Sequence, residues 1–304
     1  MSIARGLVLG ATLVVTIDAA IGGAAPVDNG CPIYAERVVD AGRTPRVLRE
    51  LSGLVASRRH RDIYWAHNDS GNDFSLYAIR ESGRVVATFS VLGVTAIDPE
   101  DIGVGPCTRN DRRSCIYVAD TGDNLRSRSH VQIVRVVEPE VLRAGPLVAD
   151  AFPFRYPDGA HDAEALLIDP RTAEAYVVTK SIMSLGDAYR VDLERTKGPT
   201  RAVHVATLSA ATGFDALVTA ASVHPSGTRV LLRTYRGLWE FRLPGATSLI
   251  DVLRAGPPRA VPAARHLQGE AVGYTSDGTG YLLGGEGDGT PLLRIDCRRS
   301  LHAP

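Results

Sequence analysis

The sequence has few of the features that mark helical, membrane-spanning or nucleic-acid-binding proteins. Aromatic residues make up 6% of its 304 residues, with 2 tryptophans, 2 methionines and 4 cysteines. Only Lys180 and Lys197 are lysines, so arginine supplies almost all of the 34 basic side chains, which balance 34 acidic ones. A net charge of zero gives no field that would attract nucleic acid or anionic lipid. Apolar residues at 44% and charged residues at 22% also exclude a disordered chain.

Several catalytic motifs are missing as well. The chain has no GxSxG nucleophile elbow, no HExxH zinc motif, no GxxxxGK[ST] phosphate loop and no GxGxxG after a strand. No pair of carboxylates has a spacing that indicates glycoside hydrolysis. The common forms of acyl transfer, zinc proteolysis and nucleotide binding therefore have no local signature in this sequence.

The first residues have the layout of a secretory signal. One positive charge at Arg5 precedes an apolar run that ends at Ile17, and small residues follow. The run is too short to span a bilayer. We therefore predict a signal peptide over residues 1–25 and a single mature domain over residues 26–304, secreted or extracytoplasmic and without a membrane span.

Export would make the four cysteines available for disulfides. Cys107 and Cys115 flank a short polar stretch and are predicted to close a small loop, which leaves Cys31 to pair with Cys297. A zinc site is the alternative, but no CxxC pair or clustered histidine accompanies these cysteines.

Short apolar or alternating runs recur along the chain with turn signals between them, and no long stretch has helical spacing. The runs fall into groups of four, which begin near Ser52, Glu100, Ala163, Val218 and Glu270. This pattern predicts an all-β β-propeller with five four-stranded blades. Six blades is the alternative if residues 139–160 hide further strands, and a β-sandwich is the competing fold class.

The last group ends one strand short. The run IYAERVV at residues 33–39 precedes the first group and has no partner of its own. We predict that this N-terminal strand completes the last blade and closes the ring, next to a bond between Cys31 and Cys297.

Polar residues at the start of each innermost strand would meet around the central channel of a propeller. The residues at this position are Ser52, Glu100, Glu164, Thr219 and Glu270. Their carboxylates would repel one another, and calcium, which takes about six to eight oxygen ligands, would relieve the repulsion. Magnesium needs a stricter octahedron and zinc prefers nitrogen and sulfur. The alternative is that these residues only cap strands and bind backbone amides.

A second polar set follows the second strand of each group, in HNDSGND at residues 67–73, in DTGDN at residues 120–124 and beyond. The candidate ligand-binding residues are Asn68, Asp69, Asp120, Asp123, Asn124, Lys180 and Arg233. They either bind a metal or an anionic ligand over the channel, or they form tight turns and solvated surface. His67 is the candidate general base, because its charge can change near neutral pH; a hydrogen-bonding role is the alternative.

With ELSGL at residues 50–54 and ring positions of serine, glutamate, glutamate, hydroxyl and glutamate, the chain resembles the five-bladed calcium-dependent apyrases. That resemblance covers the blade openings and the blade count. It implies calcium at Ser52, Glu100, Glu164 and Glu270, and hydrolysis of nucleoside di- and triphosphates. Gly53 stands where that family has an acid. Over most of its mature length the chain is also similar to uncharacterised secreted bacterial propellers with HNDSG, an acidic inner-strand pair and DxGDN, which implies no activity.

The sequence therefore predicts a secreted, calcium-binding β-propeller with a polar site over the channel, which hydrolyses phosphorylated or otherwise anionic substrates in a metal-dependent reaction. The alternative is a non-catalytic module that binds a protein or a glycan, with a structural metal or none. We expect the partner to be a small anionic molecule, a glycan or a protein rather than nucleic acid, and the protein to be a monomer.

Overall fold

The computed structural model describes residues 31, 33–194, 196–264, 266 and 268–298. The predicted signal peptide lies outside these residues. Within them the chain is all-β apart from three short helical turns, η1 (Arg46–Leu48), η2 (Gly213–Asp215) and α1 (Leu249–Arg254).

The strands follow the groups that the sequence predicts. The first group is β2 (Leu51–Ala56), β3 (Tyr64–Asn68), β4 (Ser75–Ile79) and β5 (Val85–Leu92). The second is β6 (Pro99–Pro106), β7 (Ser114–Asp120), β8 (Val131–Val137) and β9 (Gly145–Arg155). The third is β10 (Ala163–Ile168), β11 (Ala175–Thr179), β12 (Asp187–Val191) and β14 (Val203–Thr207), with the short β13 (Thr200–Arg201) between the last two. The fourth is β15 (Val218–Val223), β16 (Arg229–Thr234), β17 (Leu238–Arg242) and β18 (Arg259–Ala260). The last is β19 (Ala271–Tyr274), β20 (Gly280–Gly284) and β21 (Pro291–Asp296), preceded in the chain by β1 (Val39–Arg43).

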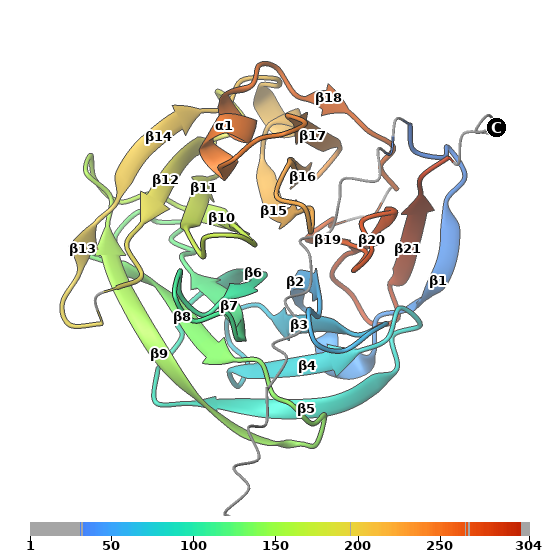
Figure 1. Ribbon diagram of the computed structural model, residues 1–304, viewed down its shortest axis with the longest axis horizontal. Helices are drawn as coiled ribbons and strands as arrows, with labels where there is room; N and C mark the ends of the chain where they lie inside the picture. Colours follow the sequence, from blue (N-terminus) through green and yellow to red (C-terminus); the bar gives the residue numbers. More distant parts are fainter. Residues whose placement is uncertain (1–30, 32, 195, 265, 267, 299–304) are drawn as a thin grey trace, which may run out of the picture.

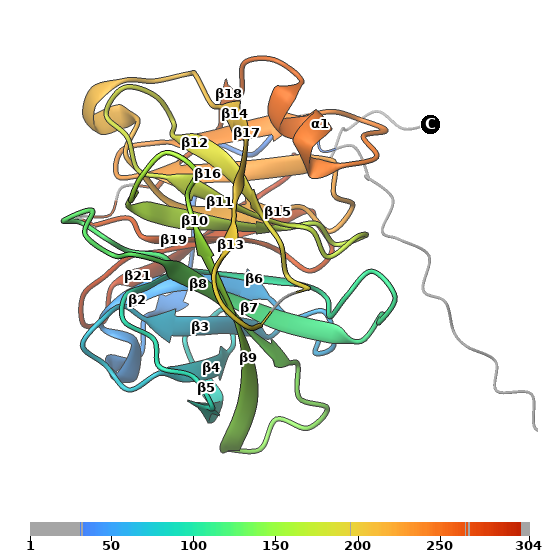
Figure 2. The same cartoon turned by 90° about the vertical axis from the view of Figure 1, so that its left-hand side faces the viewer.

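Antiparallel pairing joins the strands within each group in chain order. Three groups are separate four-stranded sheets: β10-β11-β12-β14, β15-β16-β17-β18, and β19-β20-β21-β1. The first two groups belong to one nine-stranded sheet, because their outermost strands β5 and β9 pair in parallel. The two-residue β13 also pairs in parallel with β9, at the outer edge of the molecule (Figure 2).

The groups are arranged around a common centre (Figure 1). The innermost strands contact one another in the cyclic order β2, β6, β10, β15, β19 and back to β2. Residues 139–160 contain the single long strand β9 and no second strand among the residues described here.

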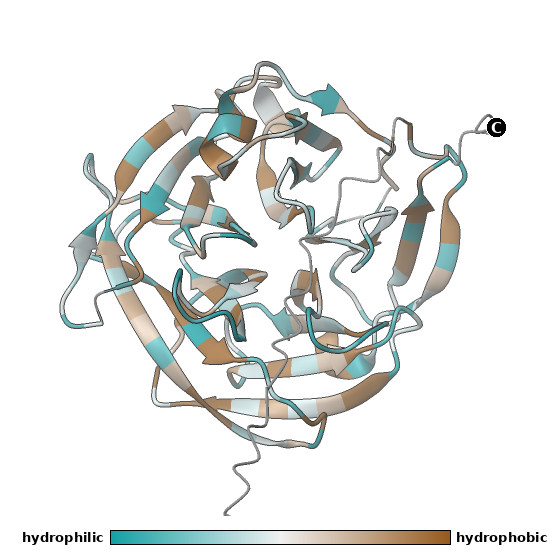
Figure 3. Ribbon diagram, in the orientation of Figure 1, coloured by the Kyte–Doolittle hydropathy of each residue, from teal (hydrophilic) through white to brown (hydrophobic). Residues whose placement is uncertain are grey.

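The hydrophobic core lies between neighbouring groups rather than at one place. One buried cluster joins the β10 and β15 groups through residues such as Tyr176 and Leu232, and another joins the β6 and β10 groups. Further clusters join the β2 group to the β6 group and the β19 group to both of its neighbours. Because most strands are buried on both faces, they are apolar along much of their length (Figure 3), as in the fully buried β10 and β11.

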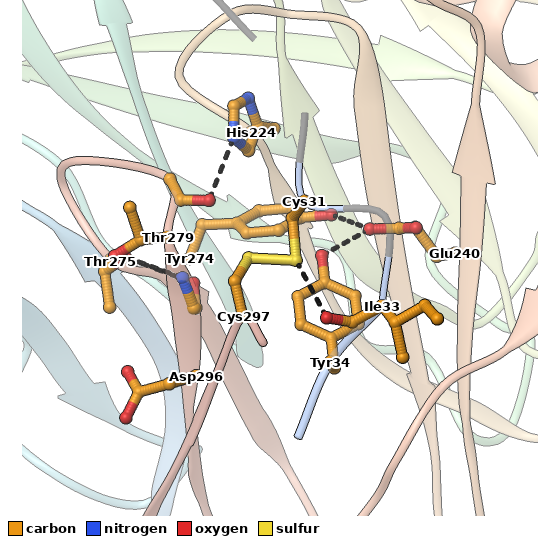
Figure 4. The surroundings of a disulfide bond; sticks show 12 residues. Cys31, Ile33, Tyr34, His224, Glu240, Tyr274, Thr275, Thr279, Asp296 and Cys297 are labelled. Carbon is orange, nitrogen blue, oxygen red and sulfur yellow. Dashed lines mark hydrogen bonds between the residues drawn. A yellow bond between two sulfur atoms is a disulfide. The ribbon is translucent and has the colours of Figure 1, made fainter. Parts of the chain in front are cut away.

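The chain closes where its two ends meet. Residues 39–43 form β1, which pairs with β21 and completes the last sheet. The predicted closing strand, residues 33–39, is therefore placed too early by several residues. Tyr34 precedes β1 on the same edge and makes an isolated bridge with Cys297, and its hydroxyl donates to the buried carboxylate of Glu240 on a neighbouring sheet (Figure 4).

Both predicted disulfides are confirmed. Cys31 and Cys297, 266 positions apart, join the ends of the chain at this closure (Figure 4). Cys107 and Cys115 join the two ends of the loop between β6 and β7.

The helix α1 has no counterpart in the sequence-based prediction. It is only 6 residues long, so its apolar pattern is too short to recognise as helical. Ser248 caps it by accepting a hydrogen bond from the Asp251 amide, and Leu249, Val252 and Leu253 bury its inner face. None of the helices in the described part of the chain is long and apolar enough to cross a membrane.

Candidate functional site

The predicted ring residues share a backbone irregularity. In four innermost strands the pairing with the next strand shifts by one residue at this position. The residues at the shift are Ser52, Glu100, Glu164 and Thr219. A bulge of this kind leaves one residue outside the ladder and redirects its side chain, and bulges are enriched next to active sites. Glu270 directly precedes β19, whose pairing with β20 is regular.

Two of these glutamates lie in a cluster of carboxylates. Oxygen atoms of Glu100, Asp162 and Glu164 lie within 4.8 Å of one another, and all three residues are buried. Oxygen atoms of Asp69, Asp98 and Glu100 satisfy the same limit. We call these five residues the acidic cluster. Glu100 belongs to both triads and is therefore its centre.

Burial and mutual repulsion make full ionisation of the acidic cluster costly. Burial raises the pKa of Glu100 well above its usual value, and the charges of Glu164 and Asp69 raise it further. Burial also raises the pKa of Asp98, as does the Asp69 carboxylate. No hydrogen-bond donor from the described residues reaches the carboxylate of Glu100. Without a cation, Glu100 is consequently the member that we expect to retain a proton.

Lys180 compensates part of this charge. Its ammonium donates to Glu164 Oε1 over 2.7 Å and to the Tyr235 hydroxyl over 3.1 Å. Burial raises the pKa of Glu164 to about 8, although Lys180 opposes this shift. Burial would lower the pKa of Lys180, but the Glu164 carboxylate outweighs burial and raises it. Lys180 pairs with only one of the five carboxylates, and Arg128 attracts Asp98 without forming an ion pair with it, so the cluster keeps an excess of negative charge.

A second charged group lies on the last two groups of strands. Burial raises the pKa of Glu270 to about 7, and the charge of Glu286 contributes. The guanidinium of Arg233 is buried, donates to the Ala271 carbonyl over 2.8 Å and lies 2.9 Å from His266 Nδ1. Burial lowers the pKa of Arg233 to about 10, while Glu270 opposes that shift. The charges of Glu270 and Arg233 therefore influence each other, although the two side chains form no ion pair.

The two hydroxyl ring residues link neighbouring strands. Ser52 donates to the Glu100 carbonyl, and Thr219 donates to the Gly269 carbonyl over 2.6 Å. Each hydroxyl therefore fixes the backbone that carries a ring glutamate. Neither hydrogen bond uses the oxygen's own lone pairs as acceptors, so both oxygens keep the ability to bind a cation.

Most of the predicted loop ligands bind backbone groups instead. Asn68 accepts from the Glu50 amide and donates to the Val47 carbonyl. Asp120 accepts from the amides of Ile97 and Asp98, and so fixes the segment that carries one member of the acidic cluster.

Asp123, in the same DTGDN loop as Asp120, also binds backbone amides. It accepts from the amides of Ser127 and Arg128, and its own amide donates to Asp162 over 2.9 Å. Asn124 is exposed, next to this turn. Of the HNDSGND and DTGDN loops, only Asp69 contributes a side chain to the acidic cluster.

His67, the candidate base, is completely buried. Its Nδ1 lies 2.9 Å from the Asn68 carbonyl, and its Nε2 has no hydrogen-bond partner among the described residues. Burial lowers its pKa. A side chain on Gly53 would place its Cβ 2.6 Å from His67 Nε2, so the glycine makes room for the ring. His67 is thus packed between strands rather than placed over the channel.

Gly122 is a further functional position that the sequence-based prediction does not include. A Cβ atom there would overlap the carboxylates of Glu100 and Asp98. The backbone of the DTGDN loop therefore passes directly beside the centre of the acidic cluster, and only glycine leaves the carboxylates in place.

Sequence reasoning also misses Asp98, Asp162 and Asp101. The signal for the first two is a repeat, since Asp98-Pro-Glu100 and Asp162-Ala-Glu164 each place an aspartate two residues before the ring glutamate. Asp98 directly precedes β6 and Asp162 directly precedes β10, so both aspartates lie at the same end of the innermost strands as the glutamates.

Asp101 has a different role, at the centre of the ring of innermost strands. One carboxylate oxygen accepts from the Leu166 amide of β10 over 2.8 Å and from the Ala221 amide of β15 over 2.9 Å. The other accepts from the Ile102 amide over 2.8 Å. Burial raises the pKa of Asp101 well above its usual value, and the three amide hydrogen bonds oppose the shift. The side chain ties three innermost strands together.

The donor set of the acidic cluster fits a hard cation. Every donor is an oxygen, no cysteine or histidine takes part, and the Glu100 carboxylate lacks a donor of its own among the described residues. Calcium uses this kind of ligand at variable geometry, whereas zinc prefers nitrogen and sulfur. Comparison with known proteins does not assign the chain to a family, because no protein-family model and no curated protein matches it.

Proposed function

We propose that this protein is an extracytoplasmic five-bladed β-propeller that binds calcium at the acidic cluster and hydrolyses a phosphorylated or otherwise anionic substrate there. The observation that carries the proposal is the position of Glu100, buried between two triads of carboxylates with a single lysine nearby. Buried like charges need a cation or protons to be tolerated.

The strand order supports a count of five blades. Each group begins at the centre and pairs outwards, and the innermost strands contact one another in a closed cycle. In this interpretation β1 supplies the outer strand of the last blade, and the parallel pairing of β5 and β9 is an outer-edge contact between two neighbouring blades.

An extracytoplasmic location agrees with the two disulfides, which persist in oxidising compartments. The apolar N-terminal run of the sequence, which includes Ile17, supports export in the same way.

The proposed calcium ligands are Asp69, Asp98, Glu100, Asp162 and Glu164, with Ser52, Thr219 and Glu270 as the remaining ring positions. When bound, calcium supplies a positive charge that polarises an oxygen of the substrate. Lys180 holds Glu164 in position and offers a cation for an anionic group. Asp69 and Asp98 are only partly buried, so they can accept a proton from water at the edge of the cluster.

A non-catalytic binding module is the second candidate, and one observation favours it. His67 is packed in the interior, and most of the polar loop residues bind backbone groups. In that case the cation would only join neighbouring blades, and the face above it would bind a glycan or a protein.

The test begins with the metal content of the mature protein and its thermal unfolding with and without a chelator. We expect about one calcium per chain, and a lower melting temperature when it is removed. Glu100→Gln and Glu164→Gln should lose both calcium and turnover on a panel of nucleotides and phosphate monoesters, with unchanged circular dichroism. Glu194→Gln, at an exposed site, is the control.

Two results would redirect the interpretation. Absence of bound metal together with no effect of the chelator would contradict the calcium site. Bound calcium without turnover on any phosphoester would favour the binding module, and Asp123→Ala would then be used to test whether the loops carry the affinity.

A further inference from the structure

The opposite end of the ring of innermost strands holds a cavity of about 370 Å³. The acidic cluster lies at the starts of these strands, whereas the cavity lies at their ends, next to Val55 of β2, Ile168 of β10 and Tyr274 of β19. At about 3.3 Å per residue, the four steps from Glu164 to Ile168 separate the two places by about 13 Å.

The strands are packed tightly between the two ends. Asp101 connects three of them near the middle. A Cβ atom on Gly103 would lie 2.8 Å from Ile168, and one on Gly105 would overlap the same side chain. A Cβ on Gly273 would lie 2.9 Å from the Leu54 carbonyl. The cavity is therefore a separate site and not the lower part of the acidic one.

The charge of the cavity is opposite to that of the acidic cluster. Its lining includes three arginines, Arg58, Arg112 and Arg171, and no aspartate or glutamate. The charge of Arg171 is already balanced within the protein, because its guanidinium pairs with Asp169 over 2.9 Å. It also donates to the Gly227 carbonyl over 3.1 Å. The other two arginines determine the charge that a ligand would meet.

The positive charges of Arg58 and Arg112 are compensated only weakly by neighbouring groups. Arg112 donates to the Arg171 carbonyl over 2.5 Å, and Arg58 forms no side-chain hydrogen bond or ion pair among the described residues. Glu138 attracts Arg58 without forming an ion pair with it. One oxygen of the Glu138 carboxylate accepts from Ser57 and from Trp65, and the other has no hydrogen-bond partner among the described residues. Partial burial lowers the pKa of Arg58, and repulsion by Arg112 lowers it further, although both residues remain exposed to solvent.

The rest of the lining is largely apolar. It includes Val55, Val104, Ile168, Pro170, Val223 and Pro225. Several of the hydroxyls present are already engaged: Ser57 donates to Glu138, and Ser222 accepts from the Tyr274 amide over 3.0 Å. A ligand would thus find an apolar surface together with two guanidinium groups that lack an anion.

We propose that this cavity, which we call the arginine cavity, binds a small amphiphilic anion, with an aromatic or aliphatic body against the apolar lining and a phosphate, sulfate or carboxylate group on Arg58 and Arg112. The volume lies in the range of small-molecule sites. Guanidinium groups bind such oxyanions through two parallel hydrogen bonds. The inference does not depend on calcium or on any reaction at the acidic cluster.

Binding of phenyl phosphate, measured by isothermal titration calorimetry at neutral pH with a chelator present, tests this inference. We expect Arg58→Gln and Arg112→Gln each to weaken binding at least about tenfold, because a hydrogen bond to a charged group is among the strongest single contacts. Arg61→Gln is the matched control, since Arg61 lies in the same loop and its side chain is 91% exposed. It should change the affinity less than about twofold.

Further ligands separate the two parts of the proposed site. Benzyl alcohol, which keeps the ring and lacks the charge, and inorganic phosphate, which keeps the charge and lacks the ring, should both bind more weakly than phenyl phosphate. Glu100→Gln should leave phenyl phosphate binding unchanged, which distinguishes this cavity from the acidic cluster. Equal affinity of the wild type and Arg58→Gln, equal affinity for benzyl alcohol, or no binding at millimolar concentration would overturn the inference.

Discussion

Without calcium, the protein should become less stable as the pH rises from about 6.5 to about 8. The cause is the raised pKa of buried carboxylates, to about 8 for Glu164 and about 7 for Glu270, against about 4.3 in the unfolded chain. Between these values the folded protein holds protons that the unfolded chain has released. Rising pH therefore favours unfolding until the folded-state pKa is passed.

The expected loss is a substantial part of the stability of a typical domain. Across this interval Glu164 contributes about 2 kcal/mol and Glu270 about 1 kcal/mol. Glu100 shifts in the same direction and adds to the loss. Three histidines, two buried and one partly buried, act oppositely, because a lowered pKa costs stability only below about pH 6.5. They are His67, His224 and His266.

Urea unfolding with a chelator, and again with calcium, at several pH values across this interval measures the effect. Calcium should reduce the pH dependence, because it stabilises the ionised carboxylates. Glu100→Gln should be more stable than the wild type at about pH 8 in the chelator, because Glu100 must there either retain a proton that the unfolded chain has released or ionise beside its neighbours. Each ionised pair within 4.8 Å costs about 3 kcal/mol at an effective dielectric constant of about 20. The variant should gain little from calcium. A chelated wild type whose stability is constant or rises over this interval, or a Glu100→Gln variant that is less stable there, would refute the reasoning.

Two other changes test the architecture around the site. Gly122→Ala should weaken calcium binding about tenfold or more, because its Cβ displaces the carboxylates of the acidic cluster. Gly145→Ala is the control and should leave the affinity unchanged, because a Cβ there comes no closer than 3.9 Å to any atom. Equal calcium affinities of the two variants in titration would contradict the assigned contact. Replacing both cysteines of the Cys31–Cys297 pair by serine should lower the free energy of unfolding, measured in urea, by about 3 kcal/mol more than replacing those of the Cys107–Cys115 pair. The reason is that the bonded positions are 266 and 8 residues apart, so the first bond restricts the unfolded chain more. The reverse order would show that chain entropy does not dominate.

The strand groups were predictable because each strand is short and apolar and is followed by a turn signal. For example, Leu231 and Leu232 in β16 and Val177 and Val178 in β11 are buried on both faces of their sheets. The disulfides were predictable from the short spacing of Cys107 and Cys115, which left Cys31 and Cys297 at the two ends of the mature chain. The exact closing strand was not predictable, because Tyr34 bridges Cys297 on the same edge along which β1 pairs with β21, and the sequence alone does not show which of the two segments forms the regular ladder.

The ring positions were predictable for a different reason, the repeat itself. Aligning the groups placed Ser52, Glu100, Glu164 and Thr219 together, and the structure has a register shift at each of them. The roles of the loop residues were not predictable, because an aspartate that binds backbone amides and one that binds a cation look alike in sequence. Asp120 and Asp69 are such a pair, and only their neighbours in space distinguish them.

Both ends of the ring of innermost strands carry uncompensated charge, of opposite sign. At one end five carboxylates face Lys180, and at the other Arg58 and Arg112 face no carboxylate in the cavity lining. A chain whose total charge is zero could pair these groups with one another, yet the packed middle of the ring keeps them apart. This separation lowers stability chiefly at the first end, where three of the carboxylates are buried, whereas Arg58 and Arg112 are exposed to solvent. A cation at the first end and an organic anion at the second would each bind the folded protein, so both should stabilise the fold, and their effects on unfolding should be additive because the two sites share no residue.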